Sequence, residues 1–291
     1  MSSNKIKILK QRHNTDTRAR HSEFISRSYT VPKICGAFTL AEVLITLGVI
    51  GVVAAVTMPT LMVRAKEKQR VSQLKKSYSV LNQAFLRATE KYGGMLDWGL
   101  AITTNTGEKD ENDNPIYDHS GNIKALSYLS EFMNAKKGTK DLVFKSYRLN
   151  GELENEKSTV SAERYVYLND NIVLVSGWVA RGLGHEDGPV MDLTIVFTDC
   201  LKKGCTYGKD IFYFKMLPDK HIIPEGLKDT YSKYYDYDLY ATNNFTFEKK
   251  CNRTKTSGEN GRSCTAWVIY NGNMDYLHCN DLSWDGKHKC K

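Results

Sequence analysis

The feature that most constrains this 291-residue chain is a run of 21 residues without charge, residues 43–63. As a helix, the run is long enough to cross a hydrocarbon layer of about 30 Å. A basic segment precedes it: residues 1–37 contain eight Lys or Arg and two acidic residues, so they carry +6 of the total net charge of +8. Because basic flanks stay on the cytoplasmic side, the pattern predicts a single membrane pass with the later residues exported.

Two other interpretations of the apolar run stay open. One is the buried core helix of a soluble domain, and the other is a secretory signal peptide cleaved near the small residues Val53, Ala54 and Ala55. Glu42 argues against the signal peptide, because a carboxylate at the entrance of the run weakens insertion by about 2–3 kcal/mol. The basic flank and the length of the run favour a membrane anchor over a core helix.

The helical pattern continues beyond the apolar run. In residues 64–92, apolar side chains recur at alternating spacings of three and four, which places them on one face of a helix. These positions are Val71, Leu74, Tyr78, Leu81, Phe85, Ala88 and Tyr92. Gly93 and Gly94 supply a stop, so we expect one helix over residues 38–92, about 80 Å long. Pro59 is expected to bend this helix rather than end it.

The exported part is predicted to be an α+β domain. Residues 97–122 are rich in Asn, Asp, Thr and Gly, which indicates a surface excursion, and residues 122–135 have the apolar spacing of a short helix. Strand-like runs follow at residues 164–168, 172–179, 192–199 and 209–217, and the first two flank a polar turn typical of a hairpin. We expect an antiparallel sheet of three or four strands packed on the amphipathic helix, although a coiled coil would use the same apolar stripe.

The start of the apolar run resembles a known signature. Phe38, Thr39, Leu40, Ala41 and Glu42, with the apolar residues after them, are similar to the N-terminal segment of type IV prepilins and type II secretion pseudopilins. The resemblance is close over residues 33–92 and loose beyond them. It implies a pilin-like fold, in which a long N-terminal helix packs on an antiparallel sheet. Pro59 also stands where that family commonly has a helix-bending proline.

The resemblance further implies proteolytic processing. In that family, an inner-membrane prepilin peptidase removes a basic leader immediately before a Phe, and the new amine is N-methylated. Carried over to this chain, the leader is residues 1–37 and the cut falls between Ala37 and Phe38, which leaves N-methylated Phe38 as the first residue. The family usually has Gly before the cut, whereas this chain has Ala37, with Gly36 one position earlier. Cleavage after Gly36 therefore stays open as an alternative.

Glu42 takes the place of the glutamate that the family keeps in its membrane segment. A lone carboxylate in lipid is costly and persists where it has a partner. The amine released at Phe38 of a neighbouring copy is such a partner, so we hypothesise that Glu42 and Phe38 set the register of stacked subunits. Apolar contacts among residues 43–62 would supply the cohesion. A catalytic role for Glu42 has no support, because no second titratable group lies within the run.

Cysteine usage indicates an oxidising compartment. The chain has seven cysteines, and Cys35 lies in the leader, so the mature chain keeps six, an even number that fits disulfides. Six cysteines allow fifteen pairings, among which we predict that neighbours in sequence pair. The predicted pairs are Cys200 with Cys205, Cys251 with Cys264, and Cys279 with Cys290. Zinc is the alternative for the last pair, because His278, Cys279, His288 and Cys290 offer four ligands.

Neither enzymatic activity, nor a metal, nor a cofactor is expected. The sequence lacks a G-x-S-x-G elbow, a phosphate-binding glycine loop and an H-E-x-x-H motif, and the charged residues around His185 are typical of a solvated turn. The acidic residues weighed as calcium ligands are Asp199, Asp210, Asp281 and Asp285. They lack the regular alternation of an oxygen-rich calcium loop. The tyrosine-rich residues 230–240 indicate a contact surface or a surface loop, without the basic groove that nucleic acid requires.

Two classes of function remain. The favoured one is a structural subunit, a minor one, of a type IV pilus or a type II secretion pseudopilus, inserted in the inner membrane and assembled into a periplasmic or extracellular fibre. Its expected partners are prepilin peptidase, other pilin or pseudopilin subunits, the inner-membrane assembly platform and the lipid bilayer. The alternative is a membrane-anchored exported binding or catalytic domain that uses the helix only as an anchor. The expected division of the chain is a leader 1–37, a membrane half 38–63, an amphipathic half 64–92 and an exported domain 93–291.

Overall fold

The computed structural model describes residues 39–110, 113–169, 171–181, 189–218, 221–227 and 245–290. Several sequence-based predictions concern residues outside these ranges. They are the leader with its processing residues Gly36, Ala37 and Phe38, the turn around His185, and the tyrosine-rich residues 230–240. Contacts divide the chain into two units, Met1–Ala54 and Ala55–Lys291.

The helix α1 (Leu40–Tyr92) has 53 residues and continues through Pro59. Its apolar residues up to position 63 are exposed almost throughout, whereas its later part buries one stripe of side chains. The buried members are Arg70, Val71, Leu74, Ser77, Leu81, Ala84, Phe85 and Ala88. Gly93 follows the helix with a φ of +81°, a conformation that glycine adopts at little cost. The helix expected from the periodicity is therefore confirmed from Leu40 onward, and the bend at Pro59 stays a prediction.

The body of the second unit is built on a six-stranded antiparallel sheet in the order β11-β10-β8-β7-β6-β3. The strands are β3 (Lys136–Lys137), β6 (Tyr165–Asn169), β7 (Ile172–Arg181), β8 (Pro189–Phe197), β10 (Ile211–Leu217) and β11 (His221–Pro224). The four central strands are those expected from the sequence, and β6 and β7 form the expected hairpin. The expectation of three or four strands is wrong, because β3 and β11 add a strand at each edge. Both edge strands are too short to show the alternation of apolar and polar residues that marks a strand in a sequence.

The large sheet is buried on both faces. Leu193 and Ile195 of β8 belong to the core that contains the buried stripe of α1, whereas Val196 and Val175 belong to a second core on the opposite face. Burial on both sides explains why these strands read as nearly continuous apolar runs. The helix α2 (Ser120–Glu131) lies near β7 and adds Leu126 and Leu129 to the first core. It begins two residues before the segment expected at 122–135 and ends four residues earlier.

A smaller sheet, in the order β5-β4-β9, covers the face of the large sheet that is turned away from α1. Its strands are β4 (Leu142–Tyr147), β5 (Leu153–Val160) and β9 (Cys205–Thr206), with β4 and β9 parallel. Leu142 and Phe144 of β4 pack into the second core. Sequence reasoning missed this sheet because β5 reads LENEKSTV and buries almost none of its side chains.

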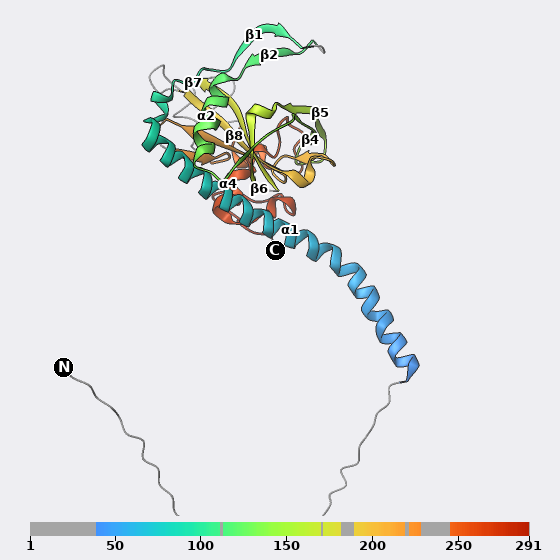
Figure 1. Cartoon of the computed structure of the whole chain (residues 1–291). Helices are drawn as coiled ribbons and strands as arrows, with labels where there is room; N and C mark the ends of the chain where they lie inside the picture. The colour runs from blue at the N-terminus through green and yellow to red at the C-terminus, as the bar shows by residue number, and fades with distance from the viewer. Residues whose placement is uncertain are drawn as a thin grey trace, which may run out of the picture. The chain divides into compact units, whose positions relative to one another are not determined.

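A hairpin of β1 (Thr104–Lys109) and β2 (Pro115–Asp118) projects from the body (Figure 1). It lies within the surface excursion expected at residues 97–122, and all of β1 is exposed. The C-terminal region contains α3 (Phe247–Lys250) and α4 (Thr265–Asn271), whose Phe247 and Trp267 rings stack at 4.1 Å and join the α1 core. Short 3-10 helices connect these elements: η1 (Met95–Trp98), η2 (Ala162–Arg164), η3 (Thr198–Cys200), η4 (Arg262–Cys264) and η5 (Asp275–Leu277).

Candidate functional site

The start of α1 forms a capping box. The backbone N–H and the Oγ1 hydroxyl of Thr39 both donate to Oε2 of Glu42 at 2.9 Å, and the backbone N–H of Glu42 donates to Oγ1 of Thr39 at 3.2 Å. A Thr followed three residues later by Glu is the sequence pattern of this cap, in which the two residues satisfy each other's orphan donors. From the sequence, Glu42 was interpreted only as a carboxylate in lipid, and the Thr39–Glu42 capping box was missed.

The capping box shows that Glu42 is stabilised within its own chain. Its carboxylate has a hydrogen-bonding partner within its own chain, and it lies at the positive end of the helix dipole, where a negative charge is stabilised. The local structure therefore accounts for part of the cost of an acid next to an apolar run. Its expected partner, the amine of Phe38 in a neighbouring copy, involves a residue outside the described ranges, so that pair stays a prediction.

The residues after Glu42 make α1 suitable as a membrane anchor. The helix contains an 18-residue window of mean hydropathy 2.3, of which none is buried. Within the described ranges, α1 is the one helix long and apolar enough to cross a membrane. The exposed large side chains include Leu44, Ile45, Val52, Leu61 and Met62. Water is a poor solvent for so continuous an apolar surface, which lipid or other apolar helices would cover.

The amphipathic half of α1 is joined to the sheet by a buried ion pair that sequence reasoning missed. Arg70 is only 5% exposed, and its Nη1 pairs with the buried carboxylate of Asp210 and donates to the carbonyl of Lys209 at 2.6 Å. Its Nη2 donates to both oxygens of Asp199, at 2.9 and 3.1 Å. The guanidinium also lies 5.1 Å from the ring centroid of Phe197. The sequence contains one indication of this ion pair, which is that Arg70 stands directly before Val71, the first residue of the apolar stripe.

The carboxylates that pair with Arg70 are those of Asp199 and Asp210, two of the four acidic residues considered as calcium ligands from the sequence. Lys66 also pairs with Asp199, and the backbone N–H of Thr206 donates to Asp210 at 2.9 Å. Burial alone would raise the pKa of Asp199, but the hydrogen bond from Lys66 and the charge of Arg70 outweigh it and hold that pKa below its ordinary value. Both carboxylates therefore serve to attach the helix. A groove of about 560 Å³ runs beside them, lined on the helix side by Met62 and Gln69 among others.

Three disulfides close loops in the second unit. They join Cys200 to Cys205, Cys251 to Cys264, and Cys279 to Cys290, which is a pairing of neighbours in sequence order. Because the sulfurs of Cys279 and Cys290 are bonded to each other, they are not thiolates that could hold zinc beside His278 and His288. In the described part of the chain, no three His, Cys, Asp or Glu side chains come together in a way that could hold a metal ion.

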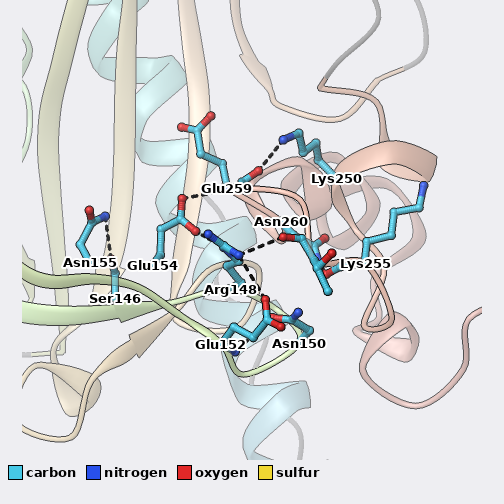
Figure 2. Close-up of polar contacts among 12 residues, drawn as sticks. Ser146, Arg148, Asn150, Glu152, Glu154, Asn155, Lys250, Lys255, Glu259 and Asn260 are labelled. Atoms are coloured by element: carbon cyan, nitrogen blue, oxygen red, sulfur yellow. Dashed lines mark hydrogen bonds and ion pairs between the residues drawn. The ribbon is translucent and has the colours of Figure 1, made fainter.

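A polar network connects the β4–β5 turn to the loop closed by the Cys251–Cys264 disulfide. Figure 2 shows Arg148 at its centre, paired with Glu152 and Glu154, while the backbone N–H of Glu259 donates to Glu154 at 3.0 Å. The side-chain amide of Asn260 donates to two carbonyls of the same loop, both at 2.7 Å. Each charge in this network has a partner, so the network is best explained as a device that holds the loop on the sheet.

No family model matches the sequence, and no curated protein or solved structure matches it either. The case for a function therefore rests on the residues and geometry of this chain.

Proposed function

We propose that the chain is a structural subunit, a minor one, of a type IV pilus or a type II secretion pseudopilus. The observation that carries the proposal is the construction of α1. A Thr39–Glu42 cap opens the helix, an exposed apolar stretch follows, and the same helix then packs a buried stripe on an antiparallel sheet. Lipid in the resting subunit and neighbouring helices in a fibre would each cover the apolar stretch, so one segment serves both states.

The proposed maturation removes residues 1–37 between Ala37 and Phe38. This cut turns an uncharged peptide N–H into a cationic amine, four residues before Glu42. In the resting subunit, Thr39 provides hydrogen bonds to the Glu42 carboxylate. In the fibre, the amine of Phe38 from an adjoining copy would add an opposite charge. Thr39 gives the carboxylate hydrogen bonds but no opposite charge, whereas the amine of Phe38 would bring one. In the low dielectric of lipid this added attraction favours the assembled state and fixes its register.

The second unit would supply the exposed surface of the fibre. Three disulfides suit an oxidising compartment, and within the second unit the Arg70 ion pairs hold the amphipathic half of α1 on the body of that unit. Inner-membrane insertion, an assembly platform and other pilin or pseudopilin subunits are parts of the same proposal.

Two experiments test it. Protein purified from membranes is digested and its N-terminal peptide is identified by mass spectrometry; the proposal predicts an N-methylated Phe38. Filaments sheared from the cells that produce the chain are then labelled with immunogold against the second unit. Labelled filaments support a fibre subunit. An N-methylated Phe38 without labelled fibres, from cells that make fibres, would contradict polymerisation while leaving the processing step in place.

The alternative is an exported binding domain held by an unprocessed anchor. A cleft on the face of the sheet away from α1, described below, favours some binding role for the second unit. The two proposals differ at the N-terminus, because a plain anchor keeps residues 1–37 on the purified protein.

A further inference from the structure

A second cavity lies on the opposite side of the large sheet from α1. It has a volume of about 250 Å³ and lies between β7, β8 and β10 on one side and β4 and β5 on the other. Its lining includes Phe144, Arg164, Trp178, Asp192, Tyr213 and Arg262. Neither the proposed processing nor the proposed assembly uses any of these residues.

A β-bulge shapes the rim of this cleft. The register between β7 and β8 shifts between Ser176 and Val179, so that Gly177 and Trp178 together face Asp192. A Cβ at Gly177 would lie 2.6 Å from the Cβ of Asp192, which explains why glycine stands there. Trp178 remains 45% exposed although β7 is an interior strand. Bulges of this kind redirect a side chain and are frequent beside functional sites.

The exposed indole has aromatic neighbours on the projecting hairpin and at the N-cap of α2. Its ring centroid lies 4.7 Å from that of Tyr117 and 6.1 Å from that of His119, both edge-on. Tyrosine and tryptophan supply large contact areas with few rotatable bonds, and for that reason they dominate binding surfaces. The bulge and the hairpin thus form an aromatic rim beside the cleft.

Arg164 supplies a cation that has no carboxylate partner among the described residues. Its Nη1 lies 3.0 Å from Nε2 of His119, and its Nη2 donates to the carbonyl of Ser176 at 3.0 Å. Its Nε is buried without a hydrogen-bond partner, and none of the ion pairs found among the described residues involves this side chain. Burial and the charge of Arg164 lower the pKa of His119 from 6.5 to about 4, so the imidazole is neutral at neutral pH.

The other arginine of the cleft, Arg262, has carboxylate partners for its charge. Arg262 pairs with Asp192, Glu225 and Glu259. Arg164 lines the same cleft, and burial lowers its pKa because nothing anionic offsets the lost hydration. Arg164 is half-buried, so its charge loses part of its hydration without a counter-ion, and this cost falls when an anion binds.

We propose that the cleft binds a carboxylate attached to an aromatic or apolar group, with Arg164 taking the carboxylate and Trp178 contacting the apolar part. The volume of about 250 Å³ admits a single such group rather than a long chain. The ligand is either a free small acid or the C-terminal carboxylate of a peptide, since both present the same chemistry. The proposal concerns the second unit alone and does not require that the chain form a fibre.

The test uses the full chain in lipid nanodiscs and measures binding by calorimetry. The probes are phenylacetate and its neutral match phenylacetamide, together with acetyl-Ala-Phe carrying either a free carboxylate or an amide at its C-terminus. The variants are Arg164→Met, Arg164→Lys and Trp178→Ala. Lys145→Met is the control, because it removes one exposed cation from β4 without touching the cleft.

The proposal predicts that each carboxylate probe binds at least about tenfold more tightly than its amide, as expected for a charge-assisted contact. Arg164→Met and Trp178→Ala should each lose about tenfold or more in affinity, Arg164→Lys should lose less than Arg164→Met, and Lys145→Met should bind as the unaltered chain does. Tighter binding of phenylacetate assigns a small acid as the ligand, and tighter binding of the peptide assigns a protein terminus.

Equal affinity for carboxylate and amide probes, or no binding of either carboxylate at millimolar concentration, would overturn the proposal. Unchanged affinity in folded Arg164→Met would overturn it as well. Circular dichroism and an unfolding curve establish folding for each variant. If Arg164→Met does not fold, the comparison of carboxylate with amide on the unaltered chain still decides the question.

Discussion

Removing the charge of Arg70 should loosen α1 from the sheet more than any other single charge removal on that helix face. The Arg70→Met variant keeps a side chain of similar length but leaves the carboxylate of Asp210 buried beside it, with the backbone N–H of Thr206 as its remaining donor. Breaking a buried pair by removing one partner costs about 3–5 kcal/mol, because the other charge is left uncompensated. We therefore expect the free energy of unfolding to fall by that amount.

Lys66→Met provides the matched control. Lys66 lies one turn earlier on α1 and pairs with Asp199, but its side chain is 57% exposed, so its loss should cost at most about 1 kcal/mol. Combining Arg70→Met with Asp210→Asn should recover part of the loss, since no unpaired buried charge then remains. The two variants should thus differ in stability because Arg70 is buried and Lys66 is exposed.

The assay is urea unfolding of the full chain in detergent, followed by tryptophan fluorescence. Trp98 and Trp267 are buried in the α1 core and report on its disruption. The slope of the free energy with urea should be the same in all variants, so that midpoints can be compared. A loss below about 1 kcal/mol in Arg70→Met, equal to that of Lys66→Met, would refute the view that this ion pair attaches the helix.

Three further outcomes are expected. Because His119 binds its proton less readily when folded, stability should fall as pH drops from 6.5 towards 4 and lose nothing more from this group below that; His119→Gln should flatten this part of the pH dependence of unfolding. Replacing Cys251 and Cys264 with Ala opens a loop of 13 residues and should lower the unfolding free energy by about 3 kcal/mol in a denaturant titration. Glu42→Leu should leave membrane insertion intact, measured by carbonate extraction, but reduce incorporation into sheared filaments; normal incorporation would count against the assembly role of Glu42.

Local patterns in the sequence predicted the elements, but not the contacts that join them. The alternation of three and four from Val71 to Tyr92 predicted α1, because an amphipathic helix shows its buried face directly. The central strands were visible because both of their faces are apolar. The polar strand β5 and the two-residue strand β3 carry no such pattern and exist because neighbouring strands hold them.

The sites that depend on distant residues were not predictable in the same way. Arg70 and Asp210 are 140 positions apart, and nothing in either local segment marks them as partners. The bulge at Gly177 likewise arises only from its register with β8. The Thr39–Glu42 cap was different, because its spacing is a local signal that a search for capping boxes finds.

The most direct test of the proposed function is the intact mass and N-terminal peptide of the protein purified from membranes of the cell that makes it. Removal of residues 1–37 and a single methyl group on the amine of Phe38 are the predicted result. A predominant species whose peptides still span Ala37 and Phe38 would mean that no new amine forms, and the proposed pairing with Glu42 would have no basis.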